Sequence, residues 1–321
     1  MKALVQDHYG TTAVLEPRDV ARPAPGPGEV LVRVHAAGVD PGVWHLVTGQ
    51  PYLLRLLGFG LRAPKNPVRG LDFAGTVEET GDGVTTVRPG DEVFGECTGS
   101  FAEYAVAKVA RIAPKPARLS FEQAAATAVS GCTALQGLRD AGRVRPGQSV
   151  LVIGAAGGVG SFAVQLAKTF GAEVTAVCST GKADVVRALG ADHVVDYTRE
   201  DFTGRRYDLV LDTASMRGLR HLRRALTPGG TLVIVGGEGG GRWLGGVQRT
   251  AVAALLSPFV GHRLRGLVSA VRGADLEVLR ELAEAGQVTP LIDRTYPLAD
   301  AVAAIDYVHK GHSAGKVVLT L

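Results

Sequence analysis

Hydrophobic and polar residues alternate along the chain in two different ways. Short runs in which apolar and polar residues alternate fill the N-terminal third, as in Glu29–His35, Ala74–Glu79 and Asp91–Phe94. Turn sequences rich in proline and glycine, such as Pro25–Gly28 and Arg88–Asp91, separate these runs. Alternation with a period of two, interrupted by such turns, is typical of short strands. The N-terminal third is therefore predicted to be a β-rich, barrel-like domain.

From about Ser120 onward, apolar strands alternate with helices. Ser120 has the position of an N-cap before an alanine-rich helix. The predicted strands are Ser149–Ile153, Glu173–Cys178, His193–Val195, Leu209–Thr213, Thr231–Val235 and Leu267–Val271, and the predicted helices are Val159–Phe170, Lys182–Leu189, Gly218–Leu226 and Asp275–Glu284. This alternation predicts an α/β fold with a doubly wound parallel sheet and helices on both faces. After Val288 the pattern becomes irregular, and Lys316–Leu321 is predicted to be a final strand that returns to the first domain.

The two patterns divide the chain into two predicted domains. Residues 1–119 and 288–321 are predicted to form the β-rich domain, and residues 120–287 are predicted to form the domain with the doubly wound parallel sheet. A length of 321 residues is consistent with two domains. The contents of 46% hydrophobic and 21% charged residues are ordinary for a globular protein in water.

A glycine-rich loop follows the first strand of the predicted parallel sheet and opens a helix. It reads Gly154-Ala-Ala-Gly157-Gly158-Val-Gly160, and this context indicates a dinucleotide-binding loop at a helix N-terminus. Gly157 lets the backbone approach a pyrophosphate, and Gly160 lets the helix pack closely on the strand. The predicted cofactor contacts are Ala156, Gly157, Gly158 and Val159. Because Ala155 replaces the first glycine of the usual motif, a flavin site or a purely structural turn stays an alternative.

The end of the next strand favours NADPH over NADH. An NAD-preferring site has an acidic residue there for the ribose hydroxyls, but this strand end reads Cys178-Ser-Thr-Gly-Lys182 and contains no acid. Hydroxyls and a lysine can hydrogen-bond a 2′-phosphate and neutralise its charge. Ser179, Thr180 and Lys182 are therefore predicted to bind the 2′-phosphate, although the two hydroxyls also suit a helix cap.

Composition excludes several other classes of protein. The three cysteines, Cys97, Cys132 and Cys178, are odd in number and widely spaced, so they indicate a reducing, cytoplasmic setting and no disulfide scaffold. The net charge of +4 is mild, and the basic run Arg217–Arg224 is interpreted as a solvated helix face instead of a nucleic-acid site. The N-terminus has no apolar signal-peptide core, and glycines interrupt the uncharged stretch Val150–Ala167, so no membrane span is predicted.

Several motifs along nearly the whole chain resemble one protein family. They are Gly38-Val-Asp40-Pro41, Gly70-Leu-Asp72-Phe-Ala-Gly75, Arg88-Pro-Gly-Asp91-Glu-Val-Phe94, Gly131-Cys-Thr133-Ala134, Gly154–Gly160 and Gly315-Lys316-Val-Val. Together they resemble the medium-chain dehydrogenase/reductase superfamily, and within it the zinc-independent quinone oxidoreductase branch. The resemblance implies a GroES-like barrel for the first domain, a Rossmann domain for the second, and a homodimer.

The zinc ligands of this superfamily have no counterpart in the chain. Zinc alcohol dehydrogenases of the superfamily have Cys at the position of Asp40 and His-Glu at the positions of Leu71 and Asp72, and their third ligand falls near Val129. Catalytic zinc needs three protein ligands, so no metal is predicted. A separate site that uses His8, His35 or His45 stays a weaker alternative.

The resemblance implies candidate catalytic residues in the first domain. Asp40 replaces an asparagine that is common in the quinone reductase branch, and either it supports the reacting group or it orients a loop. His45 falls where the branch often has a tyrosine, so it is a candidate proton donor or an outer residue. Tyr52, like Trp44, forms a wall of the substrate pocket or packs in the core. The segment Pro51–Pro67 is predicted to form a lid or helix.

The remaining predicted cofactor residues also follow from the resemblance. Thr133 matches a threonine near the nicotinamide, and Tyr197 matches a tyrosine beside the 2′-phosphate. Val235 and Gly236 end a strand where the nicotinamide half passes. Lys316 matches a C-terminal lysine near the cofactor. Ordinary packing is the alternative for Thr133 and Tyr197, and a solvated charge is the alternative for Lys316.

Without zinc, a substrate carbonyl lacks a Lewis acid. Hydride transfer to an electron-poor acceptor then becomes the expected reaction, because the developing enolate needs only hydrogen-bond donors. The predicted function is an NADPH-dependent reductase of quinones or α,β-unsaturated carbonyl compounds, whose partner is a small electron acceptor. A carbonyl or alcohol oxidoreductase and a non-catalytic NADPH-binding protein stay as alternatives.

Overall fold

The computed structural model describes residues 1–214, 217–235 and 241–321, which form two compact units. Unit 1 comprises Met1–Cys132 and Val271–Leu321, and unit 2 comprises Thr133–Ala270. The division falls within helix α3 (Ala128–Gln136) and before helix α8 (Gly273–Glu284). The predicted domain boundaries lie elsewhere, at 119/120 and 287/288. The structure groups α8 with unit 1 because this helix packs against a strand of that unit.

Unit 1 is built around a seven-stranded sheet. Its strands are β3 (Glu29–Val39), β4 (Asp72–Thr80), β5 (Glu92–Glu96), β6 (Tyr104–Lys108), β7 (Ile112–Pro114), β14 (Ile292–Pro297) and β15 (Lys316–Thr320). Neighbouring strands follow the order β14-β15-β3-β4-β5-β7, and β6 also pairs with β3. The strands β1 (Lys2–Val5) and β2 (Glu16–Asp19) form a separate antiparallel pair. The predicted β-rich domain is confirmed, and the C-terminal strand does return to it by pairing with β3.

Helices cover this sheet and complete the core of unit 1. They are α1 (Pro41–Thr48), α2 (Phe121–Ala125), α8 and α9 (Ala301–His309), with a short helical segment η2 (Arg55–Phe59). The predicted N-cap of α2 is confirmed, because Ser120 Oγ accepts the Gln123 N–H while the Gln123 side chain accepts the Ser120 N–H. Apolar residues of β3 and β4, such as Val32 and Phe73, are fully buried in the core.

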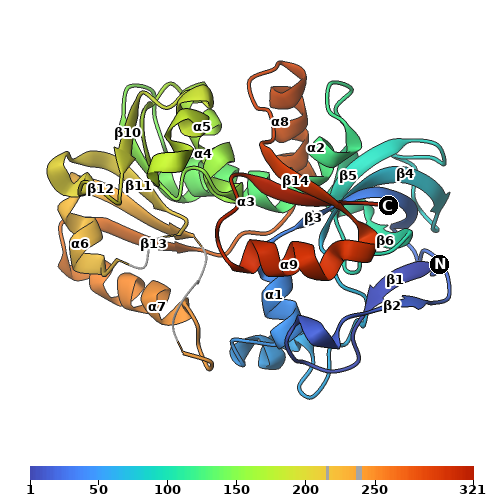
Figure 1. Cartoon of the computed structure of the whole chain (residues 1–321). Helices are drawn as coiled ribbons and strands as arrows, with labels where there is room; N and C mark the ends of the chain where they lie inside the picture. Colours follow the sequence, from blue (N-terminus) through green and yellow to red (C-terminus); the bar gives the residue numbers. More distant parts are fainter. Residues whose placement is uncertain (215–216, 236–240) are drawn as a thin grey trace. The chain divides into compact units, whose positions relative to one another are not determined.

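Unit 2 contains a parallel sheet of six strands. The strands are β8 (Ser149–Ile153), β9 (Glu173–Cys178), β10 (His193–Asp196), β11 (Tyr207–Asp212), β12 (Leu226–Val235) and β13 (Arg263–Leu267). Their order is β10-β9-β8-β11-β12-β13. Figure 1 shows α4 (Gly158–Thr169) and α5 (Ala183–Ala188) on one face and α6 (Leu219–Arg224) and α7 (Val247–Leu256) on the other. The predicted doubly wound fold is confirmed, and its strand order reverses between β8 and β11.

One predicted strand is displaced in the structure, and some helices of the structure were not predicted. The last strand of the parallel sheet was expected at Leu267–Val271, but β13 runs from Arg263 to Leu267. Arg263 and Arg265 disrupt the apolar pattern of this edge strand, which hid it in the sequence. Helices α7 and α9 were not predicted. In α9 the buried positions Ala301, Ala304, Ile305 and Val308 have the spacing of a helical face.

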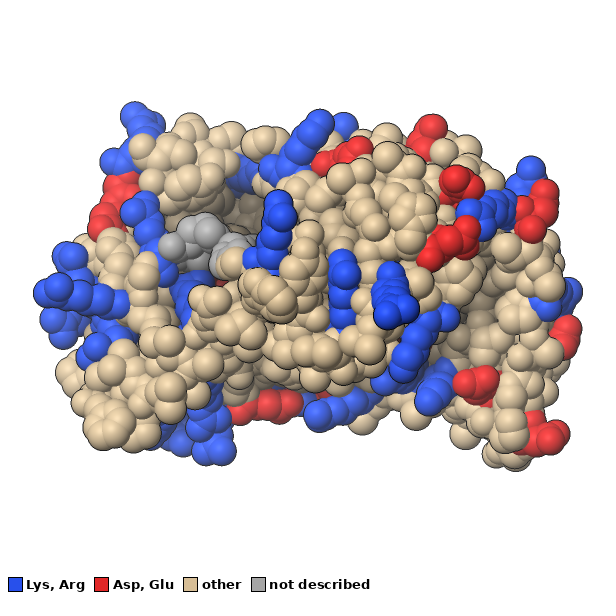
Figure 2. Space-filling view, turned by 90° about the horizontal axis from the view of Figure 1, so that it is seen from below, with Lys and Arg blue, Asp and Glu red and all other residues tan. Residues whose placement is uncertain are grey.

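Basic side chains are spread over one face of the molecule. Figure 2 shows Lys and Arg gathered at the end of unit 2 where Figure 1 places α6. Arg220 and Arg224 of α6 and the preceding Arg217 are exposed, as expected for a solvated helix face. Within the described ranges, no helix has the length and apolar character needed to cross a membrane.

Candidate active site

A tight glycine loop joins β8 to α4 in unit 2. Gly154 has a φ of +79°, and a Cβ at this position would lie 2.6 Å from Thr213 Oγ1. A Cβ on Gly160 would press against the carbonyl oxygen of Gly154 and would lie 2.7 Å from Ala155 Cα. Backbone atoms cannot move aside as a flexible side chain can. The close approach of α4 to β8 therefore requires glycine at Gly160. At Gly154 the positive φ and the contact with Thr213 favour glycine.

The N-terminus of α4 presents backbone N–H groups at the end of this loop. Gly157 is the N-cap residue, with φ −82° and ψ 179°, and α4 begins at Gly158. The first N–H groups of a helix have no acceptor within the helix, and the helix dipole makes this end positive. The predicted contacts Ala156, Gly157, Gly158 and Val159 lie in the loop or the first turn. They form a site of the kind that binds phosphate through the backbone.

The glycine loop lies where the strand order of the parallel sheet reverses. The ends of β8 and β11 are tied together, because the Thr213 N–H and hydroxyl donate to the Ile153 carbonyl at 3.1 and 2.7 Å. Ligands of doubly wound sheets bind at this position, beyond the carboxyl ends of the strands. Val235 ends β12 at the same edge, whereas the predicted contact Gly236 lies outside the described residues.

Thr133 is buried near the start of unit 2. Its hydroxyl is hydrogen-bonded with the Ser269 hydroxyl at 2.7 Å. Nearby, Gln136 Nε2 donates to the Ala270 carbonyl at 2.7 Å, and the Ala270 N–H donates to Gln136 Oε1 at 3.3 Å. These bonds fix residues 269–270 against α3. The predicted contact of Thr133 with the cofactor stays a prediction.

The predicted 2′-phosphate residues lie around the end of β9, and an acid accompanies them. In the register of the parallel sheet Asp196, the last residue of β10, is the partner of Cys178. The Thr180 hydroxyl donates to Asp196, whose other oxygen accepts the Thr198 hydroxyl at 2.7 Å. Both hydrogen bonds lower the pKa of Asp196, and the bond from Thr180 has the larger effect. This carboxylate is therefore ionised. The end of β9 itself contains no acid, but the acid at the end of the neighbouring strand β10 lies beside Thr180.

The other residues predicted at this strand end are accessible. Ser179 is the N-cap of the short segment Thr180–Lys182, without a side-chain capping bond, and Lys182 precedes α5. Tyr197 follows Asp196 directly, is 53% exposed, and donates its N–H to the Cys178 carbonyl at 3.1 Å. Ser179 and Lys182 thus follow the carboxyl end of β9 and Tyr197 follows that of the neighbouring β10, and their contacts with a cofactor stay predictions.

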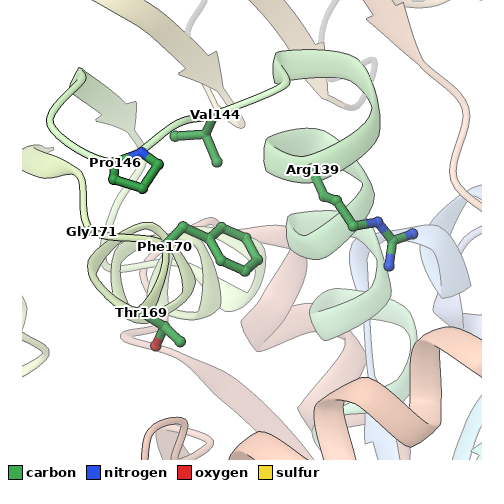
Figure 3. A pocket seen from close by; sticks show the side chains of 6 residues that line it. All are labelled: Arg139, Val144, Pro146, Thr169, Phe170 and Gly171. Carbon is green, nitrogen blue, oxygen red and sulfur yellow. The ribbon is translucent and has the colours of Figure 1, made fainter.

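A hollow of about 420 Å³ in unit 2 lies beside the other end of the parallel strands. Its lining includes Pro146, which precedes β8, and Phe170 and Gly171, which precede β9. Figure 3 shows the Phe170 ring and Val144 lining this space. Because the glycine loop follows the opposite end of β8, this hollow is separate from the candidate cofactor site.

A cluster of charged groups is buried in the core of unit 1. Lys316, at the start of β15, is 2% exposed and hydrogen-bonds Asp40, Asp72 Oδ2 at 3.1 Å and Ser130 Oγ at 3.2 Å. The Ser130 hydroxyl also donates to Asp40 Oδ1 at 3.2 Å, and the Val129 N–H donates to Asp72 Oδ1 at 2.9 Å. The solvated alternative for Lys316 is therefore wrong, while its predicted contact with the cofactor stays a prediction.

Backbone geometry brings these groups together from distant parts of the chain. Gly38 of β3 pairs with Asp72 of β4, and a Cβ on Gly38 would lie 2.9 Å from Asp72 Cβ. Asp40 follows β3 and is the N-cap residue of α1. Because β15 pairs with the same end of β3 through Val317 and Val39, Lys316 is placed next to both carboxyls.

The three charged groups of the cluster shift one another's pKa values. Burial alone raises the pKa of Asp40, but the Lys316 charge and the donated hydrogen bonds outweigh it and leave this pKa below its ordinary value. Burial and the Asp40 charge raise the pKa of Asp72 well above its ordinary value. Burial alone lowers the pKa of Lys316, but the two carboxyls reverse this effect and raise it. Asp40 is therefore an ionised acceptor paired with a charged lysine.

The other catalytic candidates lie on and after α1. His45 is half-buried, and its Nδ1–H donates to the Gln50 carbonyl at 2.8 Å. The Arg55 guanidinium lies 4.7 Å from the centre of the Tyr52 ring. Trp44 stacks on His309 at 3.6 Å between ring centres, as expected for its packing alternative. The structure does not test whether His45 or Tyr52 contacts a substrate.

The segment Pro51–Pro67 includes the short helical segment η2 and exposes apolar side chains. Leu56 and Leu57 are 72% and 66% exposed. Tyr9 holds the segment by donating its hydroxyl to the carbonyls of Phe59 and Gly60 at 3.0 and 2.8 Å. The helix predicted for this segment is thus present in part, and its role as a lid stays a prediction.

The positions of the superfamily's zinc ligands contain a different set of groups. Asp40 and Asp72 both bind the Lys316 ammonium, and Val129 contributes its backbone N–H. An ammonium ion in contact with two carboxylates competes with any cation at this point. In the part of the chain that the structure describes, no three His, Cys, Asp or Glu side chains converge as metal ligands do. These residues do not fit a catalytic zinc, whose site needs three ligands.

Two family descriptions match the chain. Residues 26–117 match the alcohol dehydrogenase GroES-like domain, and residues 189–319 match the zinc-binding dehydrogenase domain. The first match lies in unit 1, and the second begins within unit 2 and continues into unit 1.

Individual relatives cover nearly the whole chain. The 2-methylene-furan-3-one reductase of Solanum lycopersicum is 34% identical over 99% of this chain and 79% of its own length. The spectinabilin polyketide synthase system protein NorB of Streptomyces orinoci is 36% identical over 96% of this chain, which spans only 14% of that protein. The solved structure of the quinone oxidoreductase from Coxiella burnetii is 30% identical, with a TM-score of 0.88 over 100% of this chain and 99% of that chain. The chain belongs to the medium-chain dehydrogenase/reductase superfamily, in its quinone oxidoreductase branch.

Proposed function

We propose that the chain is an NADPH-dependent oxidoreductase that transfers hydride to a quinone or to an α,β-unsaturated carbonyl compound without zinc. The observation that carries this proposal is the glycine loop at the N-terminus of α4, located where the strand order of a parallel sheet reverses. Relatives named as a quinone oxidoreductase and as a 2-methylene-furan-3-one reductase support the two acceptor classes.

The residues of unit 2 fit a nicotinamide dinucleotide. The loop at Ala156–Val159 would hold the pyrophosphate through backbone N–H groups, since Cβ atoms at Gly154 and Gly160 would collide with their surroundings. Ser179, Lys182 and Tyr197 would surround the 2′-phosphate, and Thr133 and Val235 would flank the nicotinamide half. The cofactor, when bound, supplies the hydride, and the protein orients it.

The groups at the positions of the superfamily's zinc ligands favour a substrate that is already electron-poor and accepts hydride readily. The Lys316 ammonium, which is bound by Asp40 and Asp72, is the buried cation at this point. An ammonium ion in such contacts does not polarise a substrate carbonyl as an open metal site does. A quinone or an enone already accepts hydride readily, so hydrogen-bond donors are sufficient to stabilise the product anion.

We expect a purified sample to oxidise NADPH with at least one acceptor from a panel of naphthoquinones and conjugated enals. The loss of reduced nicotinamide absorbance measures this reaction, with NADH and a saturated ketone as parallel samples. The proposal requires a higher kcat/KM for quinone or enal than for the ketone, and for NADPH than for NADH. Binding of NADPH without turnover of any acceptor would instead support a non-catalytic protein.

Removal of the Asp196 charge is expected to strengthen NADPH binding. In Asp196→Asn, the amide can still accept the Thr180 hydrogen bond, but the carboxylate no longer repels a 2′-phosphate. Because Asp196 is only half-buried and solvent screens its charge, we expect NADPH to bind about twofold to fivefold more tightly, with little change for NADH. Titration of nicotinamide fluorescence measures both constants. Asp140→Asn, which changes an exposed acid far from Asp196 in the sequence, serves as the control. If Asp196→Asn binds NADPH and NADH more tightly by the same factor, Asp196 does not lie beside the 2′-phosphate.

We also propose that the enzyme acts in the cytoplasm as a homodimer. Three buried free cysteines support a reducing compartment. Sedimentation of the purified chain tests the dimer, since a single species with the mass of one chain would contradict it.

A further inference from the structure

Four large apolar side chains lie at the surface in the segment that follows α1 in unit 1. Leu56, Leu57 and Leu61 are 72%, 66% and 65% exposed. Phe59, which lies among them, is 44% exposed. In Figure 1 this part of the chain lies beyond the end of α1, on the side away from the sheet of unit 1. Single exposed apolar side chains are ordinary, whereas a group of them marks a surface where another molecule docks. We call residues 56–61 the apolar tip.

A formed turn carries the apolar tip. The Tyr9 hydroxyl donates to the carbonyls of Phe59 and Gly60 at 3.0 and 2.8 Å. The Lys65 N–H also donates to the Phe59 carbonyl at 3.0 Å and closes the loop. Gly60 has a φ of +111°, and a Cβ there would press against the Ala63 carbonyl oxygen, so the chain reverses tightly at this glycine. The geometry of this turn keeps the apolar side chains away from the core of unit 1.

The base of the segment is fixed to the end of α1. Arg55 Nε donates to the Gly49 carbonyl at 2.9 Å, and the guanidinium also donates to the Thr48 carbonyl at 3.2 Å. The guanidinium lies 4.3 Å from the centre of the Tyr9 ring. The last carbonyls of a helix form its negative end and attract a cation. The Arg55 charge is therefore used inside the protein, and the charges that can meet a ligand lie further along the segment.

The segment that carries the apolar tip has positive charges only. The chain from residue 41 to residue 71 contains four Lys or Arg residues and no Asp or Glu. Arg62 and Lys65, shortly after the tip, are exposed and have no ion-pair partner within the described ranges. Asp7, on the N-terminal segment that packs against the turn, is paired with Arg18, 2.6 Å away. The tip thus combines apolar side chains with two uncompensated positive charges.

We propose that the apolar tip docks the protein on the surface of an anionic lipid bilayer. Leu56, Leu57 and Leu61 enter the boundary between headgroups and acyl chains, and Arg62 and Lys65 meet the headgroup phosphates. Burial of apolar side chains, together with attraction between basic side chains and anionic lipids, holds a protein on a membrane surface without a spanning helix. This docking goes beyond the proposed reaction and does not depend on it.

A second copy of the chain suits the apolar tip less well than a bilayer does. The exposed parts of the four apolar side chains amount to on the order of 300 Å², whereas each partner in a stable dimer buries about 800 Å². A symmetric dimer brings the same patch of both copies together. Arg62 and Lys65 of one copy would then meet those of the other, with no acid in the segment to compensate them. A bilayer has no such limit of area and supplies the missing negative charges.

Binding to lipid vesicles tests the charge component of the docking. We expect the protein to cosediment with vesicles that contain phosphatidylglycerol and to bind vesicles of phosphatidylcholine alone about 10-fold more weakly, because two basic side chains add to the affinity for an anionic surface. The double variant Arg62→Gln, Lys65→Gln should remove this preference. Lys2→Gln, Lys108→Gln, which changes two other exposed lysines of unit 1, should keep it. Equal binding of wild type to both kinds of vesicle would overturn the proposal.

Serine at two leucines tests the apolar component. The double variant Leu56→Ser, Leu57→Ser should bind the anionic vesicles about 10-fold more weakly, because the tip then has less apolar surface to insert. Both positions are exposed, so the midpoint of thermal unfolding should not change. Leu255→Ser in unit 2 is the matched control, since Leu255 is 73% exposed, and it should bind as wild type does. An equal loss in this control would show that the tip is not the docking surface.

Fluorescence locates the apolar tip in the bilayer. In Leu57→Trp, the fluorescence added to that of wild type should be quenched by lipids with brominated acyl chains, whereas the fluorescence added in Leu255→Trp should not. A wild-type protein that binds neither kind of vesicle would overturn the proposal. The same holds if Leu56→Ser, Leu57→Ser lowers the mass of the sedimenting species while vesicle binding stays unchanged, since the tip would then be an interface between copies of the chain.

Discussion

Replacement of Lys316 with methionine is expected to lower the free energy of unfolding by about 3–5 kcal/mol, the usual cost of breaking a buried ion pair by removing one partner. The variant leaves the Asp40 carboxylate in the core without its cation, and it removes a donor from Asp72 and Ser130. Chemical denaturation at neutral pH measures the loss. The loss should become smaller at acid pH, where protonation of Asp40 removes the uncompensated charge.

Two further variants separate this ion pair from general effects of the substitution. Lys310→Met changes an exposed lysine of the same unit, and its effect should stay within about 0.5 kcal/mol. The double variant Lys316→Met, Asp40→Asn removes both charges and should recover part of the stability, since a neutral pair has no charge to compensate. A loss in Lys316→Met no larger than that in Lys310→Met would contradict the buried ion pair.

Replacement of Gly160 with alanine is expected to weaken NADPH binding by on the order of 10-fold, which corresponds to about 1.4 kcal/mol lost from the contacts of the displaced helix N-terminus with the phosphates. The new methyl group meets the Gly154 carbonyl and Ala155 Cα, both of which are backbone atoms. Helix α4 must therefore move away from β8 and carry its N–H groups with it. Overpacking of this kind costs about 1–3 kcal/mol of stability. Cofactor titration and denaturation measure the two effects.

Gly204→Ala provides the matched control for Gly160→Ala. Gly204 also belongs to unit 2, and a Cβ there meets no atom within 4 Å. We expect this variant to bind NADPH as wild type does, with stability equal to or slightly above that of wild type. Unchanged NADPH affinity in Gly160→Ala would show that the cofactor does not depend on the glycine loop.

Apolar runs predicted the parallel sheet well because its inner strands are buried on both faces. The predicted bounds of β8 and β9, Ser149–Ile153 and Glu173–Cys178, agree with the structure. The edge strand β13 was displaced in the prediction because its arginines resemble a surface loop. Helix α9 had a readable signal in its buried positions, which the irregular sequence after Val288 obscured.

The charged cluster could not be predicted because its members come from four separate segments. Lys316 and Asp40 are 276 positions apart, and only the pairing of β15 and β4 with β3 brings them together. The resemblance identified Asp40 and Lys316 separately, as a catalytic and a cofactor residue. Asp196 was missed for a similar reason, since its proximity to Thr180 follows from the register of β9 and β10.

The most direct test of the proposed zinc-free, NADPH-dependent reaction is the rate of naphthoquinone reduction by protein that has been treated with a strong chelator and analysed for metal. We expect chelator-treated protein with a negligible metal content to oxidise NADPH at the rate of untreated protein, because the buried Lys316 ammonium, bound to Asp40 and Asp72, is the cation of the site. Loss of activity on chelation, with recovery on addition of about one zinc ion per chain, would contradict this account.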